Sequence, residues 1–279
     1  MLADSRLPPL ARYPVSFGLG SALSIRDKSI LLSGGKHNLT ECFVLSKGHW
    51  NFHSNMVHGR KFHAALNIGG SIYVFGGYRS GTDRDTFEYL PAGSTTWILG
   101  AVTLPKPGFS HGGAVLVNGG REVLLVGGMG CGERLLIFDV KTHSFKTRSS
   151  FKLQIERIGV GCANIPGADD EVLVVGGWSD VVVFHRSSEI VNVKNWSVRP
   201  GPPLASKRRN VGLGQVTYKG RELLAAFGGH NGRKWLTDVE FYDPAVGVWQ
   251  PSGLSLRSPC QSGGLSFQHK DVSFDVLLD

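Results

Sequence analysis

The sequence lacks long apolar segments, and its beginning lacks the layout of an export signal. No run of apolar residues approaches the ~18 to 20 positions that a membrane-spanning helix needs. The first 21 residues include Asp4 and three prolines, without the continuous apolar stretch of a secretory signal. These absences predict a cytoplasmic protein with no membrane segment.

Cysteine and histidine do not occur in the spacings of common metal sites. The four cysteines, which are Cys42, Cys131, Cys162 and Cys260, form no Cys-x-x-Cys pair, so they are interpreted as reduced thiols. The densest histidines are His49, His53, His58 and His63. Two of them would share a face only on a helix, whereas this segment is expected to run from a strand into a loop. We therefore predict no metal site.

Motifs for catalysis and cofactor binding also lack their structural context. We expect no nucleophile elbow between a strand and a helix. The glycines from Gly127 to Gly132 resemble a phosphate-binding loop, but no helix is predicted to follow them. The acids Asp169, Asp170 and Glu171 fall in a predicted hairpin turn, where solvated carboxylates are expected. The sequence thus predicts neither catalytic residues nor a cofactor.

Glycine, in contrast, is abundant and periodic. It supplies 38 of 279 residues, about twice its usual share of ~7%. Five diglycines each end a short apolar run, at steps of 42, 51, 49 and 52 residues. They are Gly34-Gly35, Gly76-Gly77, Gly127-Gly128, Gly176-Gly177 and Gly228-Gly229. A period near ~50 residues is typical of a propeller in which each repeat is one four-stranded blade.

The positions around each diglycine support this interpretation. An apolar strand and an Asn/Gly turn precede each apolar run, which predicts a hairpin. An aromatic residue follows each diglycine at Trp50, Trp97, Phe145, Trp196 and Trp249. Glycine is required where neighbouring blades crowd the backbone, and the aromatic residue is expected to fill the space between blades.

This order of residues resembles the Kelch repeat, whose pattern is a diglycine, a downstream Tyr and a Trp. The last repeat contains all three, at Gly228-Gly229, Tyr242 and Trp249, and the resemblance covers almost the whole chain. It implies an all-β, Kelch-type β-propeller over residues 1–279, with five complete four-stranded blades and a partial sixth. The expected repeats are 13–52, 60–98, 108–147, 157–198, 209–250 and, in part, 257–279.

Two features depart from a regular set of repeats. The fourth repeat offers two candidate third strands, Val181–Phe184 and Ile190–Val193. The sixth repeat contains only a first hairpin, so the fourth strand of that blade is expected near Leu7–Arg12. An incomplete last blade is expected either of a fragment of a larger protein or of an incomplete gene model.

The charges are unevenly distributed among the predicted loops. In a propeller, the loops from second to third strand and from fourth to first strand share one face, here called the diglycine-loop face. The other two kinds of turn form the hairpin-turn face. Eight cations against the single acid Glu156 fall in the fourth-to-first loops. A basic diglycine-loop face suits a partner with an acidic segment, because arginine binds carboxylates through paired hydrogen bonds.

We predict that the partner-binding residues lie on this face. They are Lys36, His37, Asn38, Arg60, Tyr78, Arg79, Arg84, Phe109, Arg134, Arg157, Trp178, Lys207, Arg208, Arg209, His230, Asn231 and Arg233. An Arg before the first strand is also common in Kelch repeats as a structural residue. Arg60 and Arg157 therefore have both interpretations, and one residue of Lys207–Arg209 can occupy the structural position.

The predicted function is a protein-binding scaffold, and the resemblance implies substrate recognition for a ubiquitin ligase. Alternatives from the same fold are an enzyme of the oxidase or sugar mutarotase type and an actin-binding protein. Nucleic acid is disfavoured as a partner. The pI of 9.4 meets the electrostatic criterion, but no basic helix or RNA-binding motif accompanies it.

Overall fold

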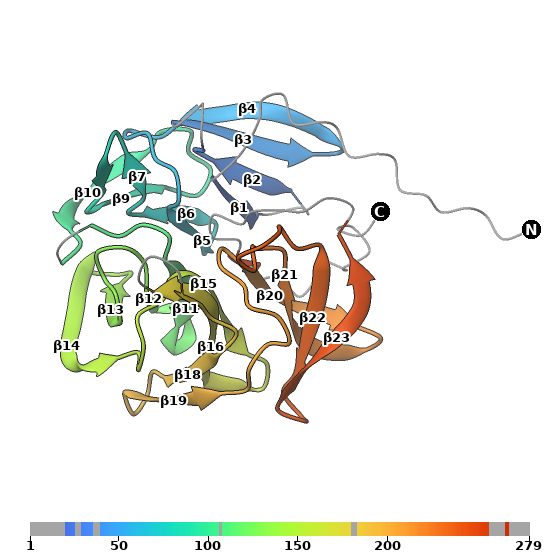
Figure 1. The fold of residues 1–279 in the computed structure, drawn as a ribbon. Coiled ribbons are helices and arrows are strands. Elements are labelled where there is room, and N and C mark those ends of the chain that lie inside the picture. The colour runs from blue at the N-terminus through green and yellow to red at the C-terminus, as the bar shows by residue number, and fades with distance from the viewer. Residues whose placement is uncertain are drawn as a thin grey trace, which may run out of the picture.

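The computed structural model describes residues 20–25, 29–35, 40–105, 108–179, 183–256 and 266–267, and these form a ring of antiparallel blades around one axis (Figure 1). Each of five blades contains four consecutive long strands, as the repeat predicted. The first two blades contain β1 (Ser21–Ser24), β2 (Ile30–Ser33), β3 (Glu41–Ser46), β4 (His49–Asn55), β5 (Ala64–Ile68), β6 (Ser71–Phe75), β9 (Thr86–Leu90) and β10 (Ile98–Thr103).

The next three blades follow the same order. They contain β11 (Gly113–Val117), β12 (Glu122–Val126), β13 (Arg134–Asp139), β14 (Ser144–Lys152), β15 (Ile158–Ile165), β16 (Ala168–Ser179), β18 (Ser188–Asn192), β19 (Ser197–Gly201), β20 (Gly212–Tyr218), β21 (Arg221–Phe227), β22 (Asp238–Asp243) and β23 (Val248–Ser255). The short elements are β7 (Tyr78–Arg79), β8 (Thr82–Asp83), β17 (Val183–Phe184), β24 (Ser266–Phe267) and the 3₁₀ turn η1 (Asn118–Gly120).

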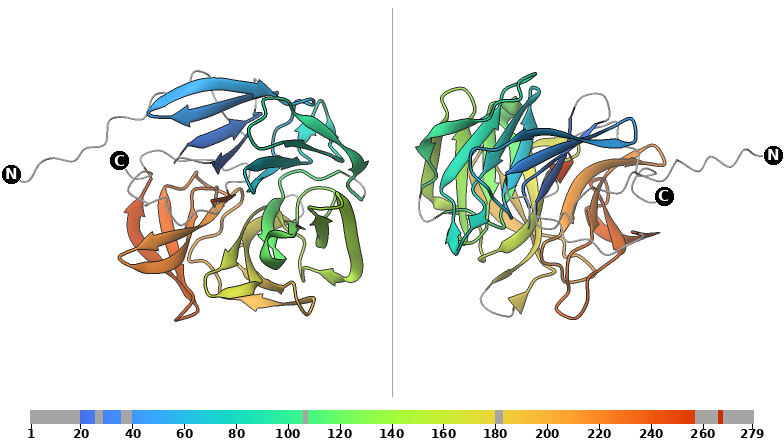
Figure 2. Two further views of the ribbon diagram at one scale, coloured as in Figure 1. Left: turned by 180° about the vertical axis from the view of Figure 1, so that it is seen from behind. Right: turned by 90° about the horizontal axis from the view of Figure 1, so that it is seen from above.

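The first strand of each blade lies at the axis, and the fourth lies at the rim (Figure 2). Consecutive inner strands contact one another from β1 to β5, β11, β15 and β20. The second strands are the most completely buried, because they have neighbours on both sides and a blade on each face. In β12, for example, Val123 to Val126 are all fully buried. The apolar runs of three to five residues that precede the diglycines in the sequence are these second strands.

The two irregular repeats differ in the structure: the fourth forms a complete blade, whereas the described part of the sixth is one short strand. In the fourth blade the third strand is β18, which pairs with β16, whereas Val183–Phe184 forms the short β17 against the end of β16. Of the predicted sixth repeat, only Ser266–Phe267 is described. It pairs in parallel with Leu213 and Gly214 of β20 and also contacts β1, so it extends the fifth sheet toward the first blade.

The diglycines lie at close contacts between blades. A Cβ on Gly176 would lie 2.3 Å from the carbonyl oxygen of Arg208 in the next blade, and the N–H of Gly177 donates to that oxygen at 2.8 Å. Gly127 has the same 2.3 Å approach to the carbonyl of Arg157. A side chain at either position would separate the blades, which explains why the repeat uses glycine there.

Aromatic residues fill the boundaries between blades, as predicted. Trp97 of the second blade is buried among side chains of the first, and its Nε1–H donates to Ser54 Oγ at 3.0 Å. Trp196 packs against Phe151 of the preceding blade, with ring centroids 4.8 Å apart. Trp249 belongs to the cluster between the fourth and fifth blades. The blades are therefore held together by apolar contact as well as by backbone hydrogen bonds.

Candidate binding face

Three of the predicted partner-binding arginines are structural. Arg157 is 1% exposed; its Nε donates to Glu189 Oε1 at 2.8 Å and its Nη1 donates to the carbonyl of Gly176 at 2.7 Å. Burial lowers the pKa of the Arg157 guanidinium, and the hydrogen bond and charge of Glu189 oppose that shift. This arginine fastens the diglycine to the third strand of its own blade, while its backbone carbonyl binds the preceding blade.

The same arrangement recurs in two other blades. Arg60 is buried against Glu88 and the carbonyl of Gly76. Arg208 is buried against Glu240, with its Nη1 2.9 Å from the carbonyl of Gly228. The prediction that Arg60, Arg157 and Arg208 contact a partner is therefore corrected. Each guanidinium is enclosed because its several donors satisfy carbonyl and carboxylate oxygens inside the blade.

In the third blade, Phe109 occupies the position of these arginines, and the prediction that Phe109 contacts a partner is also corrected. It is 1% exposed, and a Cβ on Gly76 would lie against its carbonyl just as others lie against the arginine carbonyls. The position of the partner carboxylate is occupied by Leu136, which belongs to the same buried cluster. An apolar pair thus replaces the buried ion pair in this blade.

The remaining predicted residues stay at the surface, apart from three that lie outside the described residues, Lys36, His37 and Asn38. Half-buried or exposed side chains belong to Tyr78, Arg79, Arg84, Arg134, Trp178, Lys207, Arg209, His230, Asn231 and Arg233. All of these residues lie on the diglycine-loop face, in its loops or in the strand ends and the short strand β7 beside them.

A ring of backbone contacts surrounds the mouth of the axis on this face. Phe62, His111, Gly159 and Asn210 each lie two residues after the buried position of their blade, and all have positive φ, between 51° and 69°. The N–H of His111 donates to Phe62 O at 2.9 Å, Gly159 donates to His111 O at 2.6 Å, and Asn210 donates to Gly159 O at 2.7 Å. Positive φ is rare for a bulky residue such as Phe, so the ring holds Phe62 in a strained geometry.

The sequence analysis did not identify this ring. Only sequence position could have revealed it, because the four residues have no side-chain chemistry in common. Each lies two residues after the buried Arg60, Phe109, Arg157 or Arg208 of its blade. Their neighbours Lys61, Ser110 and Arg209 form bridges with the residue that follows each diglycine, Tyr78, Met129 and His230 respectively. The diglycine loops and the fourth-to-first loops therefore meet at the mouth.

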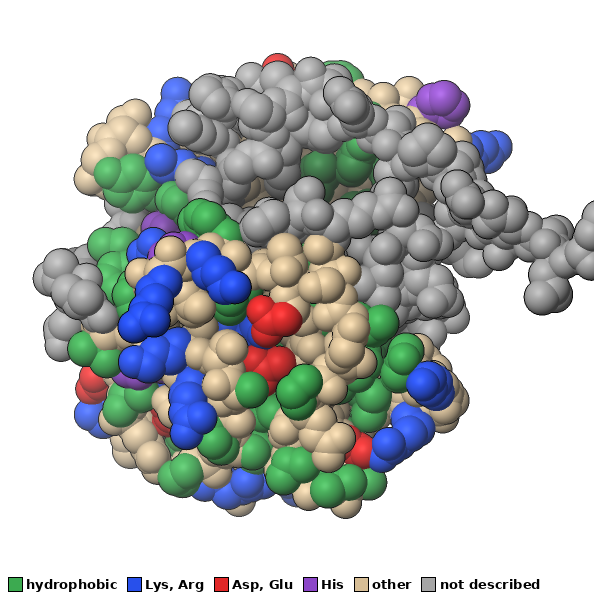
Figure 3. All heavy atoms as spheres, turned by 45° about the vertical axis from the view of Figure 1, so that its right-hand side comes forward, with side chains coloured by type: hydrophobic (Ala, Val, Ile, Leu, Met, Phe, Trp, Pro, Cys, Tyr) green, Lys and Arg blue, Asp and Glu red, His purple; other side chains and the backbone are tan. Residues whose placement is uncertain are grey.

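The mouth is positively charged. Burial, together with the charges of Lys61 and Arg209, lowers the pKa of His111 to about 4. Lys61 and Arg209 come from the second and fifth blades, so cations of two different blades act on one imidazole of the third blade. The His111 ring stacks on Phe62 at 3.6 Å between centroids. Figure 3 shows Lys and Arg side chains gathered on one part of the surface, with few acidic side chains among them.

Two guanidinium groups near the mouth have unused donors. The Nε atoms of Arg84 and Arg209 are buried, yet they have no hydrogen-bond partner among the described residues. The Cζ of Arg209 lies 5.1 Å from the centre of the Phe184 ring, and Lys61 Nζ lies 5.2 Å from that of Tyr78. Cationic groups set against aromatic rings can bind a carboxylate while the rings provide apolar contact.

One segment at the mouth, Gly108-Phe109-Ser110-His111-Gly112, has the residue spacing of a nucleophile elbow, a motif that was predicted to be absent between a strand and a helix. Ser110 is fully buried, and the segment leads into the strand β11 rather than into a helix. Within the described residues, no three His, Cys, Asp or Glu side chains are grouped so that they could hold a metal ion. No helix there is long and apolar enough to cross a membrane.

Comparison with known proteins agrees with this architecture. The family model described as "Kelch motif" matches residues 59–97, which include the second diglycine and Trp97. The chain is a β-propeller that contains a Kelch motif. Its Kelch repeats are also similar to "Kelch-like protein 23" of Mus musculus and of Homo sapiens, at 24% identity over 220 residues. Each match covers 77% of this chain and 36% of the relative, so the chain spans about a third of the length of these relatives.

Proposed function

We propose that this Kelch propeller is a protein-binding scaffold, and that an acidic segment of the partner docks over the mouth on the diglycine-loop face. The observation that supports this most directly is the convergence of Lys61 and Arg209 on His111, with the Nε of Arg209 unpaired. A carboxylate placed there would neutralise both cations and accept the unused hydrogen bond.

The surroundings of the mouth favour a peptide over a small ion. Loops from four blades end there, and the half-buried Tyr78, Trp178 and Phe184 provide apolar surface beside the charges. The ring of backbone hydrogen bonds keeps the loops in place, so little ordering is needed when a partner binds. Similarity to "Kelch-like protein 23" supports a scaffold role in general terms.

The test begins with capture of the partner by proximity labelling, followed by binding measurements on purified proteins. Reversing Lys207, Arg208 and Arg209 together would be a poor experiment, since Arg208 is buried with Glu240 and its loss would unfold the blade. The sharper variant is Lys61→Glu with Arg209→Glu. We expect at least a tenfold loss of affinity, a slower association rate and a weaker dependence on salt.

The matched control is Arg121→Glu with Lys141→Glu, which makes the same change in net charge at exposed positions of the hairpin-turn face. We expect it to leave affinity within about twofold. Loss of binding in the control pair, with binding intact in the Lys61 and Arg209 pair, would show that the partner uses the other face. The ubiquitin-ligase role implied by the resemblance stays a prediction, and co-purification of a ligase subunit with the chain would test it.

A further inference from the structure

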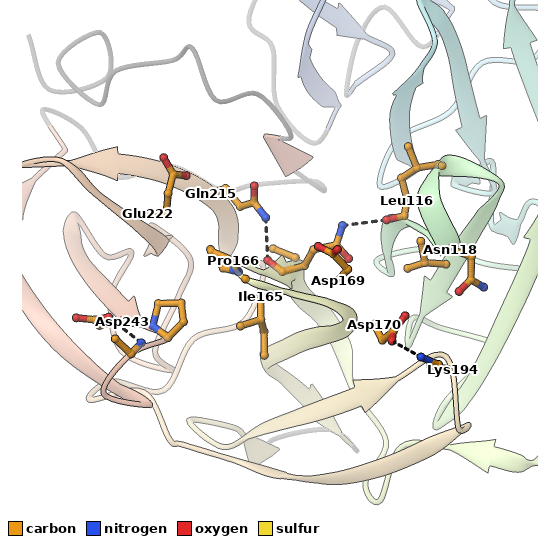
Figure 4. Close-up of a pocket in the computed structure, with 18 of the residues that line it drawn as sticks. Leu116, Asn118, Ile165, Pro166, Asp169, Asp170, Lys194, Gln215, Glu222 and Asp243 are labelled. Atoms are coloured by element: carbon orange, nitrogen blue, oxygen red, sulfur yellow. Dashed lines mark hydrogen bonds and ion pairs between the residues drawn. The ribbon is translucent and has the colours of Figure 1, made fainter.

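The hairpin-turn face contains a cavity of about 1310 Å³ that the proposed function does not use (Figure 4). Turns of the third, fourth and fifth blades form it: the turn with η1, the turn between β15 and β16, and the turn between β20 and β21. Lys194 and Asp243, from the outer turns of the last two blades, also line it. The cavity lies on the opposite side of the ring from the basic mouth.

Side-chain amides that link neighbouring inner strands form part of its wall. Asn164 Nδ2 donates to the carbonyl of Leu116 at 2.9 Å, and Gln215 Nε2 donates to the carbonyl of Asn164 at 3.1 Å (Figure 4). These residues occupy the same position in successive inner strands. The donors face neighbouring blades, and the Oδ1 of Asn164 is buried without a partner among the described residues. A buried acceptor without a hydrogen bond is unfavourable, so this oxygen favours a ligand that donates hydrogen bonds.

The carboxylates of the cavity are only partly neutralised. Asp170 lies 3.6 Å from Lys194, and Asp243 is paired with Arg221. Asp169, in contrast, has no ion pair with the described residues. Glu222 accepts a hydrogen bond from Thr217 Oγ1 at 2.7 Å and likewise has no cationic partner there. Among the described residues, four carboxylates and three cations line the cavity, which leaves it one negative charge, and the third cation is Arg121, which donates only to the carbonyl of Asn118. The unpaired carboxylates Asp169 and Glu222 come from adjacent blades and line the same cavity as the unpaired acceptor of Asn164.

The geometry points to a site for an amine or guanidinium group, which we propose is the Lys or Arg side chain of a partner segment. Such a group carries several N–H donors and one positive charge, which suits a wall that offers unpaired carboxylates and an unpaired amide oxygen. The cavity is large enough for a side chain together with part of its backbone. The two faces of the propeller would then recognise segments of opposite charge.

A dye-labelled peptide with two arginines separated by glycines is a suitable probe, read by fluorescence anisotropy with the whole chain. The chain has a formal net charge of +8, which repels this peptide in general, so saturable binding requires a local acidic site. We expect saturable binding that weakens at least tenfold in the variant Asp169→Asn with Glu222→Gln. Replacing the arginines of the peptide by uncharged citrulline should weaken binding to a similar extent.

The matched control is Asp85→Asn with Glu156→Gln, which removes two carboxylates from the diglycine-loop face and gives the same net charge. Thermal melting of both variants checks that each remains folded. Equal weakening in the two variants would attribute binding to overall charge and overturn the proposal, as would the absence of saturable binding in the unaltered chain. Neither result bears on the Lys61 and Arg209 experiment, which concerns the other face.

Discussion

Replacing Gly176 by alanine tests directly whether glycine is required because blades crowd one another. Gly176 has φ of +65°, and a Cβ there would lie 2.3 Å from the carbonyl oxygen of Arg208. Gly167, in the hairpin turn of the same blade, has φ of +79°, but a Cβ there would meet nothing within 4 Å. Comparing the alanine substitutions at Gly176 and Gly167 therefore distinguishes the cost of backbone strain from the cost of crowding between blades.

The expected magnitudes follow from these contacts. A left-handed conformation costs an alanine roughly 1–2 kcal/mol, and both substitutions incur it. Crowding in a well-packed interior adds about 1–3 kcal/mol, at Gly176 alone. We therefore expect a loss of about 2–5 kcal/mol for Gly176→Ala against about 1–2 kcal/mol for Gly167→Ala. The effect of alanine on the unfolded chain is the same in both variants and cancels in the comparison.

Urea denaturation followed by tryptophan fluorescence measures both free energies of unfolding, and thermal melting provides a second observable. For a chain of this size, 1 kcal/mol corresponds to about 2–4 °C in melting temperature. Equal losses for the two variants would refute the argument, because they would leave no contribution from the carbonyl of Arg208. A larger loss at Gly167 would refute the assignment of the blade boundary itself.

Three further predictions concern the interior and the bound content of the protein. Removing one member of the buried ion pair, as in Glu189→Leu, should lower the free energy of unfolding by about 3–5 kcal/mol in urea denaturation. The double variant Arg157→Phe with Glu189→Leu should recover most of that loss, because the third blade already contains Phe109 and Leu136 at these two positions. A double variant as unstable as the single one would mean that the ion pair itself is needed. Burial, followed by the charge of Arg60, lowers the pKa of His63 from 6.5 to about 3, so the unfolded chain takes up a proton that the folded chain does not. The stability that comes from this pKa difference is fully present above pH 6.5 and is lost as the pH falls toward 3. The variant His63→Gln should therefore show a melting temperature that depends less on pH between pH 7 and pH 5. An unchanged dependence would contradict the burial of a neutral His63. Elemental analysis and absorbance of the purified chain should reveal no stoichiometric copper, zinc or flavin, and a bound metal would favour the enzyme alternative.

Local sequence predicted the blades because each blade is built from neighbouring segments. The diglycine, the apolar run before it and the aromatic residue after it all act within one repeat or at its edge, so their period was visible in the chain. The third blade, with Phe145 in place of Trp, was still recognised because its diglycine remained. The ambiguous third strand of the fourth blade was not, since both Val183–Phe184 and β18 have strand-forming residues and only pairing with β16 distinguishes them.

The sequence by itself determined the fold class, the repeat period and the excess of cations in one set of loops. Only the tertiary structure decided which cations are accessible: Arg208 and Arg209 are adjacent in the chain, yet one is sealed against Glu240 and the other lies at the mouth. The physical reason is that burial of a charged group depends on partners about 30 residues away in sequence, here Glu240, Glu189 and Glu88, which reach the arginines through strand pairing. Periodicity in a sequence records which positions repeat, but the carbonyls and carboxylates that enclose a guanidinium come together only when the blade forms.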